Sequence, residues 1–153
     1  MFRLGEASLA EQMPLLQKEA SERQVVPDGY LDETEFTMQF QQNTYTGCNQ
    51  VDKGGIFFLE EGARLRDYRS DYDKSSAIRG GLAYVTGYGT YLHIESPSGS
   101  INNMKAYKGA VFYIENGATV RVNTAVSFRY NSAYEGTIAF AIDGARFIAE
   151  DNI

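Results

Sequence analysis

Lys53-Gly54-Gly55-Ile56-Phe57-Phe58 begins a pattern that returns three more times along this chain of 153 residues. The later copies are Arg79-Gly80-Gly81-Leu82-Ala83-Tyr84, Lys108-Gly109-Ala110-Val111-Phe112-Tyr113 and Glu135-Gly136-Thr137-Ile138-Ala139-Phe140. Their first glycines lie 26, 29 and 27 residues apart, and in each copy a second glycine opens another strand-like run, at Gly62, Gly89, Gly117 and Gly144. A repeat of this length, built from aliphatic and aromatic residues, predicts the stacked coils of a parallel β-solenoid.

Residues of one kind recur at fixed distances from the first glycine of each copy. Aliphatic residues stand two positions after it, at Ile56, Leu82, Val111 and Ile138, and aromatic residues four positions after it, at Phe58, Tyr84, Tyr113 and Phe140. Because side chains alternate along a strand with period two, both sets are predicted to share one face and to stack about 4.8 Å apart. We therefore expect Val111 and Ile138, and likewise Tyr113 and Phe140, to be buried neighbours in adjacent coils.

Further columns complete the predicted coil. The next strand contributes an inward column at Leu65, Leu92, Val120 and Phe147, and a third, less regular side contributes Tyr72, Ile101 and Phe128. Gly117 and Gly144 follow Asn116 and Asp143, a pairing typical of tight turns, and we expect both glycines at positive φ. The sequence thus predicts an all-β domain over residues 36–153, with about four coils of 26–29 residues.

Residues 1–35 have a different pattern. Leu9, Met13, Leu16 and Ala20 recur at roughly helical spacing, and Pro14 suits the first turn of a second helix. A solenoid needs caps because its last coil exposes an apolar face and unpaired backbone groups. We expect this segment to be a partly helical cap or arm.

Two short motifs resemble a known repeat family. Phe40-Gln41-Gln42-Asn43 and Phe128-Arg129-Tyr130-Asn131 are similar to the FxxN element of polymorphic-outer-membrane-protein-type repeats, and Gly54-Gly55-Ile56 and Gly109-Ala110-Val111 are similar to their GGAI element. The resemblance covers about residues 36–153. It implies a right-handed parallel β-helix of the kind found in large surface or adhesin-like proteins.

Composition excludes several classes of function. The net charge of −6 argues against a general nucleic-acid or anionic-membrane surface, because clustered cations supply most of that affinity. A single cysteine, Cys48, excludes an internal disulfide framework and a cysteine-based zinc site. We expect Cys48 to be a buried or half-buried thiol, and we expect no cofactor.

Nothing near Met1 resembles a signal or transit peptide, and no apolar run approaches membrane-spanning length, so we expect no membrane insertion. The compartment stays open. At the other end, residues 149–153 fall inside the fourth coil and offer no capping sequence. We therefore expect that end to be covered by other protein subunits or by further coils of a longer chain.

The most enzyme-like stretch is Asp67-Tyr68-Arg69-Ser70-Asp71-Tyr72-Asp73. Its three aspartates could collect Ca²⁺ or act as a carboxylate pair beside Arg66 or Arg69, as in β-helices that cleave acidic polysaccharides. The competing interpretation, which we favour, is a solvated acidic loop on the irregular side of the coil. His93, the sole histidine, has no nucleophile paired with it and is expected on an outward, solvent-exposed position.

Stacking also predicts two outward basic columns. One contains Arg66, His93 and Arg121, and the other contains Lys53, Arg79 and Lys108. Like charges at strand spacing repel unless they are neutralised, either by neighbouring acids such as Glu60, Glu61, Glu95 and Glu115 or by a partner. These six residues are the candidate docking positions for an acidic protein surface or an anionic glycan. Tyr68, Tyr88, Tyr91 and Tyr130 are expected on outward or corner positions, where they would bind sugars or proteins or simply stabilise the ladder.

The sequence therefore favours a non-enzymatic structural or docking subunit, or a fragment of a longer scaffold. The alternatives are a carbohydrate-binding or carbohydrate-cleaving β-helix that uses the acidic stretch and the tyrosines, and an adhesin-like surface repeat.

Overall fold

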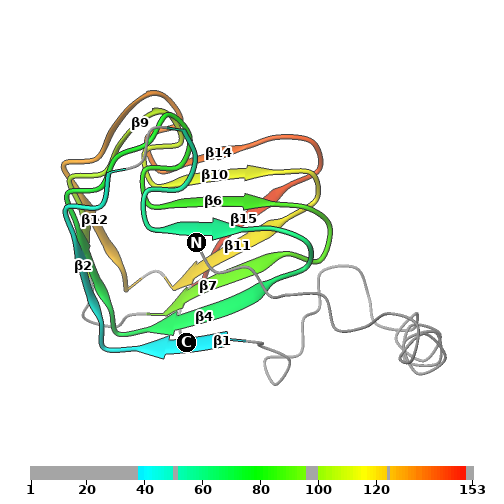
Figure 1. Ribbon diagram of the computed structural model, residues 1–153, viewed down its shortest axis with the longest axis horizontal. Coiled ribbons are helices and arrows are strands. Elements are labelled where there is room, and N and C mark those ends of the chain that lie inside the picture. The colour runs from blue at the N-terminus through cyan, green and yellow to red at the C-terminus, as the bar shows by residue number, and fades with distance from the viewer. Residues whose placement is uncertain (1–37, 50–51, 96–99, 124, 151–153) are drawn as a thin grey trace, which may run out of the picture. The chain divides into compact units, whose positions relative to one another are not determined.

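The computed structural model describes residues 38–49, 52–95, 100–123 and 125–150, and shows a parallel β-solenoid of about four coils (Figure 1). All described elements are strands, so the predicted all-β solenoid is confirmed. The partly helical cap expected for residues 1–35 lies outside the described residues.

The strands form four parallel sheets, which we number in chain order, and one of them has strands in two coils only. Sheet 1 has five strands: β1 (Met38–Gln41), β4 (Arg64–Tyr68), β7 (Tyr91–Glu95), β11 (Thr119–Asn123) and β15 (Arg146–Glu150). Sheet 2 has four: β2 (Thr44–Thr46), β5 (Asp71–Asp73), β8 (Ser100–Asn102) and β12 (Ser127–Arg129). Sheet 3 pairs β9 (Lys105–Lys108) with β13 (Ser132–Glu135). Sheet 4 has four: β3 (Phe57–Leu59), β6 (Ala83–Thr86), β10 (Phe112–Glu115) and β14 (Ala139–Ala141).

The predicted register is confirmed. In sheet 4, Phe57 pairs with Ala83, Ala83 with Phe112, and Phe112 with Ala139, which reproduces the spacing of the glycines. In sheet 1, Leu65 pairs with Leu92, Leu92 with Val120, and Val120 with Phe147. Every strand pair is parallel, so each coil covers the one before it.

The prediction that the aliphatic and aromatic columns share one face of sheet 4 is wrong. Leu82 and Val111 lie in the core, whereas Tyr84 alternates with the core residues Ala83 and Val85 and therefore lies on the outer face. The backbone gives the reason: the N–H groups of Leu82 and Ala83 both donate to the carbonyl of Val111, at 3.0 and 2.9 Å. Two consecutive residues thus oppose one carbonyl group, as in a β-bulge. The alternation of inward and outward side chains therefore shifts by one residue after Leu82.

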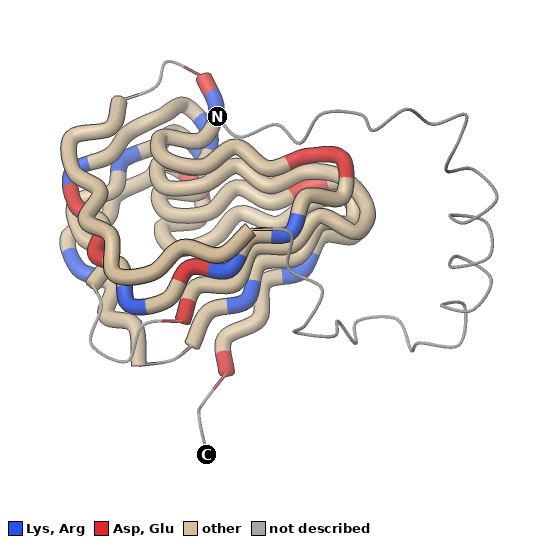
Figure 2. Tube along the Cα trace, turned by 60° about the horizontal axis from the view of Figure 1, so that its bottom comes forward, with Lys and Arg blue, Asp and Glu red and all other residues tan. Residues whose placement is uncertain are grey.

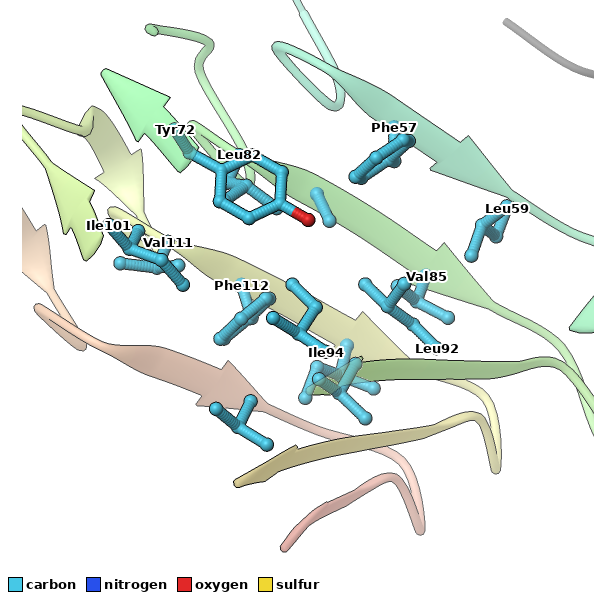
Figure 3. Close-up of a cluster of buried hydrophobic side chains, with 14 of the residues drawn as sticks. Phe57, Leu59, Tyr72, Leu82, Val85, Leu92, Ile94, Ile101, Val111 and Phe112 are labelled. Atoms are coloured by element: carbon cyan, nitrogen blue, oxygen red, sulfur yellow. The ribbon is translucent and has the colours of Figure 1, made fainter. Parts of the chain in front are cut away.

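The core runs along the inside of the coils. Figure 3 shows Phe57, Leu82 and Phe112 among the side chains gathered there, and all three are buried. The inward residues of sheets 1 and 2 join the same cluster, including Leu92, Ile94, Tyr72 and Ile101. The inward columns predicted for these two sheets are therefore confirmed.

Glycines form the corners for two separate reasons. Gly117 and Gly144 have φ values of 77° and 74°, as predicted, in turns where Asn116 and Asp143 also have positive φ. At the bulge, Gly80 has φ 66°, and a Cβ there would lie 2.1 Å from the carbonyl oxygen of Ala83. A side chain at Gly80 would therefore meet both backbone strain and a direct clash.

Candidate functional site

The column Lys53, Arg79 and Lys108 is present in the predicted register. Bridges join Lys53 to Arg79 and Arg79 to Lys108, and Figure 2 shows basic positions recurring in successive coils. All three side chains are half-buried. They stand at the point where the chain leaves sheet 3 and approaches the bulge of sheet 4.

Each of these cations lies over an aromatic ring of the following coil. Lys53 Nζ is 4.7 Å from the ring centre of Tyr84, Arg79 Cζ is 5.9 Å from that of Tyr113, and Lys108 Nζ is 4.7 Å from that of Phe140. A cation over a ring face contributes about 0.5–1 kcal/mol at an exposed site and more when water is excluded. The column therefore links consecutive coils, and Lys108 also forms an ion pair with Glu135 at 3.0 Å.

The rings under these cations form a continuous ladder on the outer face of sheet 4. Phe58, Tyr84, Tyr113 and Phe140 stack with centre-to-centre distances of 5.2 Å. The Tyr84 hydroxyl donates to the carboxylate of Glu115, and burial together with this bond raises the Tyr84 pKa above its usual range. The neighbours predicted at Tyr113 and Phe140 are confirmed as a stacked pair, with Tyr113 buried and Phe140 half-buried.

The second basic column, Arg66, His93 and Arg121, is also in register. Arg66 donates to Glu95 through two nitrogens, at 3.1 and 2.5 Å, and Arg121 pairs with Glu150. Acids one coil further on thus neutralise both arginines. The expectation that His93 is solvent-exposed is wrong, because its side chain lies between these two arginine positions and beside Tyr91 and is only 6% exposed.

Both columns therefore carry internal contacts with which a partner would have to compete. Docking by these six residues stays a prediction. The sequence left two ways in which the charge of the columns could be neutralised, by acids of the same chain or by a partner. Acids of the same chain neutralise Arg66, Arg121 and Lys108.

The acidic stretch does not form a shared site. Asp71 is exposed and Asp73 is partly exposed, whereas Asp67 points into the core and is fully buried. The favoured interpretation of a solvated loop is therefore wrong for Asp67, because this residue occupies an inward position of sheet 1, in register with the core residue Ile94. Among the described residues, no three His, Cys, Asp or Glu side chains gather closely enough to hold a metal ion.

Asp67 is held by hydroxyl groups. Ser70 and Tyr72 both donate to its carboxylate, Tyr72 at 2.5 Å. Burial raises the pKa of the Asp67 carboxyl, and these two hydrogen bonds lower it by less. Burial and the neighbouring Asp67 carboxylate also raise the pKa of Tyr45 to about 12. Sequence reasoning missed this buried cluster, although the inward register of Asp67 with Ile94 was available from the repeat.

The expected surface tyrosines are scattered. Tyr88 and Tyr130 are 82% and 80% exposed, Tyr68 is half-buried, and Tyr91 is buried. The sequence analysis missed a stacked pair on sheet 3, Tyr107 and Tyr134, whose centres are 5.1 Å apart. Their rings lie parallel, with an interplanar angle of 4°, and both residues are exposed.

Cys48, expected as a buried or half-buried thiol, is half-buried, and its Sγ lies 3.9 Å from the carbonyl oxygen of Thr46. It therefore contributes no convergent group to any of these clusters.

The fourth coil forms an open end. Its strands β12, β13, β14 and β15 are the last in their sheets, and within the described residues no strand follows them. Ile138 pairs in register next to Val111, as the bond from the Phe112 N–H to its carbonyl shows, but it is 39% exposed. Ile142 is 40% exposed. The expectation that Ile138 is buried is wrong, because no described coil covers it.

Small residues occupy the inward positions of β14, the edge strand of sheet 4 in this coil. Where the third coil has Phe112 and Ile114, the fourth has Ala139 and Ala141. Phe147 leans against Phe112 from β15, at 5.7 Å between ring centres, and remains half-buried. The end of the core is thus lined by two alanines beside exposed isoleucines.

Comparisons of the chain with models of known protein families, with curated proteins and with solved structures find no match. The molecule is therefore classed by its fold, a parallel β-solenoid of about four coils. The resemblance to polymorphic-outer-membrane-protein-type repeats rests on the two motifs alone. In the part of the chain that the structure describes, no helix is long and apolar enough to cross a membrane.

Proposed function

We propose that this protein is a non-enzymatic docking subunit of a larger assembly and that it joins its partner through the open fourth coil. The observation that carries this proposal is the row of edge strands β12–β15 together with the exposed Ile138 and Ile142. Unpaired strand edges form ready templates for another chain, and natural proteins blunt them with charges, proline or a covering segment. The described residues 138–142 contain none of these.

The enzyme alternative has less support. The three aspartates considered for Ca²⁺ or for acid–base chemistry diverge, because Asp67 faces the core while Asp71 faces solvent. The glycan alternative has the two basic columns, but ion pairs and ring contacts already engage most of their members. The docking proposal relies instead on the edge of the fourth coil, where Ile138 and Ile142 are exposed.

The finer features expected from the sequence belong to this proposal. We place the solenoid among right-handed β-helices of the polymorphic-outer-membrane-protein type, supported by the FxxN-like and GGAI-like motifs and by the general preference for right-handed parallel crossovers. A partly helical N-terminal cap is likewise proposed.

Sedimentation velocity over a concentration series tests the docking end. The isolated full chain is expected to self-associate through its exposed apolar edge, burying more than about 1,000 Å² if the contact is specific. Ile142→Lys should reduce this association, because it places a charge in the exposed edge. Tyr88→Lys, which alters a more exposed aromatic residue (82% against 40% for Ile142) in a turn of an inner coil, should leave it unchanged. A monomer at every concentration, with no difference among the three proteins, would overturn the proposal.

A further inference from the structure

The open edge of β14 differs from the rest of sheet 4 in the size of its inward side chains. Along one inward column the residues are Phe57, Ala83, Phe112 and Ala139, and along the next they are Leu59, Val85, Ile114 and Ala141. The first column alternates large and small. Its last member, Ala139, is small and half-buried, whereas Ala83 in the same column is fully buried.

Ala83, in the same column as Ala139, shows which neighbours cover a small inward residue of sheet 4. It pairs with Phe57 on one side and with Phe112 on the other, so a phenylalanine covers the alanine from each neighbouring coil. Among the described strands, Ala139 has Phe112 on one side and no partner on the other. The missing neighbour is therefore a bulky apolar residue, because interiors pack to nearly uniform density and a small side chain needs a large one opposite it.

The backbone of the same two residues is also positioned for pairing. The carbonyl of Ile138 accepts from Phe112, and the N–H of Ile142 donates to Ile114 at 3.0 Å. Successive residues of a strand direct their backbone groups to opposite neighbours, so Ala139 and Ala141 direct theirs away from β10. On the outer face Phe140 is the last ring of the described aromatic ladder, stacked on Tyr113 and contacted by Lys108.

We propose that the fourth coil recognises an extended strand of another polypeptide. This strand pairs parallel with β14, places bulky apolar side chains over Ala139 and Ala141, and stacks an aromatic ring on Phe140. The inference rests on the proposed docking function and adds the chemistry of the segment that docks. The chain's own β3 shows the pattern, since Phe57 and Leu59 face inward and Phe58 faces outward to stack on Tyr84.

A rigid second copy of this chain stacked head to tail, with its β3 on β14, is a poorer occupant than a single strand. Sheet 1 has five strands and sheet 4 has four, so the described solenoid extends by one strand beyond a whole number of turns. If β3 of a second copy paired with β14, its β1 would have to occupy the place of β15. One of these two strands would have to leave its sheet, at the cost of its backbone hydrogen bonds.

Binding of labelled peptides to the full chain tests the pattern, measured by fluorescence anisotropy. The probe has the sequence of residues 53–60 with two lysines added at each end. A second peptide carries alanine at the positions of Phe57 and Leu59, and a third has the probe sequence reversed. We expect saturable binding of the probe and about a hundredfold weaker binding of the alanine peptide, since two large apolar side chains lose their burial. The reversed peptide can present the same side chains only as an antiparallel strand, so binding as tight as that of the probe would contradict parallel pairing with β14.

Variants of the chain locate the site. Ala139→Leu fills the position from the protein side and should weaken probe binding at least about tenfold, with unfolding stability equal to or above that of the wild type. Ala125→Leu, at an exposed alanine outside sheet 4, is the matched control and should leave binding unchanged. Amide exchange should show protection of Ala139 and Ala141 when the probe is bound.

The outcomes separate this inference from the function on which it rests. Equal binding of the probe and the alanine peptide, protection at β1–β3 instead of β14, or no saturable binding up to about 1 mM would each overturn the recognition pattern. If self-association nevertheless falls with Ile142→Lys, the docking end stands and only its specificity is wrong. Assembly into long filaments that the probe does not shorten would identify a second copy as the occupant and would also overturn this inference.

Discussion

The first and fourth coils end the same solenoid in opposite ways. At the first end, the rings of Phe40, Tyr45, Phe57 and Tyr72 pack against one another, with Tyr45 and Tyr72 stacked at 5.3 Å. Phe57 is buried although β3 is the edge strand of sheet 4. At the last end, β14 presents Ala139 and Ala141, and isoleucines stay exposed. The edge strand β3 is therefore buried where its own phenylalanine meets large side chains of the adjacent sheets, whereas β14 stays open where its own inward residues are small.

The largest effect is expected in the aliphatic column, where a charge at Val111 in an inner coil is compared with a charge at Ile138 in the open coil. Val111→Asp should lower the free energy of unfolding by about 3 kcal/mol or more, because it buries an unpaired charge. Ile138→Asp, next in the same column, should cost less than about 1 kcal/mol, because the new carboxylate reaches water. Urea unfolding followed by circular dichroism measures both. Equal costs would contradict the difference between the coils.

The second prediction compares the two ends directly. Phe57→Ala should cost about 3–5 kcal/mol, since it leaves a cavity among the rings of the first end. Phe147→Ala should cost about half as much or less, because Phe147 is half-buried at the open end and the space left is partly solvated. The same denaturant experiment applies. A costlier loss at Phe147 would mean that the fourth coil is closed.

A third prediction concerns the buried carboxyl of Asp67 on β4, one strand in from the first end. The pKa of Asp67 is higher in the folded state than in the unfolded chain, so folding takes up a proton. Its stabilising contribution is fully present below the unfolded pKa and is lost as pH rises through the folded pKa. The wild type should therefore gain stability relative to Asp67→Asn as pH is lowered from 7 toward 4. Asp71→Asn, at an exposed site, is the control. Parallel pH profiles for the wild type and Asp67→Asn would contradict this assignment.

The smallest expected effect concerns the contacts that join neighbouring coils. Arg79→Met keeps the apolar stem and removes the cation over Tyr113, so it should cost about 0.5–1 kcal/mol. Arg129→Met, at an exposed site on β12, should cost less than about 0.5 kcal/mol. Thermal unfolding of both variants against the wild type is sufficient. A gain in stability for Arg79→Met would contradict this prediction. It would indicate that repulsion among the basic side chains outweighs the cation–ring contact, as expected if an external anion normally neutralises the column.

Much of this architecture could be predicted from the repeat. The period, the parallel register, the corner glycines and the columns Leu65–Leu92–Val120 and Tyr72–Ile101 all follow from spacing, because a solenoid coil contacts only its neighbours. The basic columns were predicted on the same ground and are in register. Local sequence thus carries most of the information about which residues stack.

Only the tertiary structure decided which way those residues face and what they contact. The shared carbonyl of Val111 shifts the alternation by one residue, and this moves the aromatic column from the predicted core to the outer face, beneath Lys53, Arg79 and Lys108. Hydrogen bonds from Ser70 and Tyr72 make an aspartate acceptable in the core, and ion pairs one coil apart take up Arg66 and Arg121. A repeat in the sequence determines neighbours along the solenoid axis, whereas orientation depends on backbone hydrogen bonds and on contacts between sheets, which no single repeat encodes.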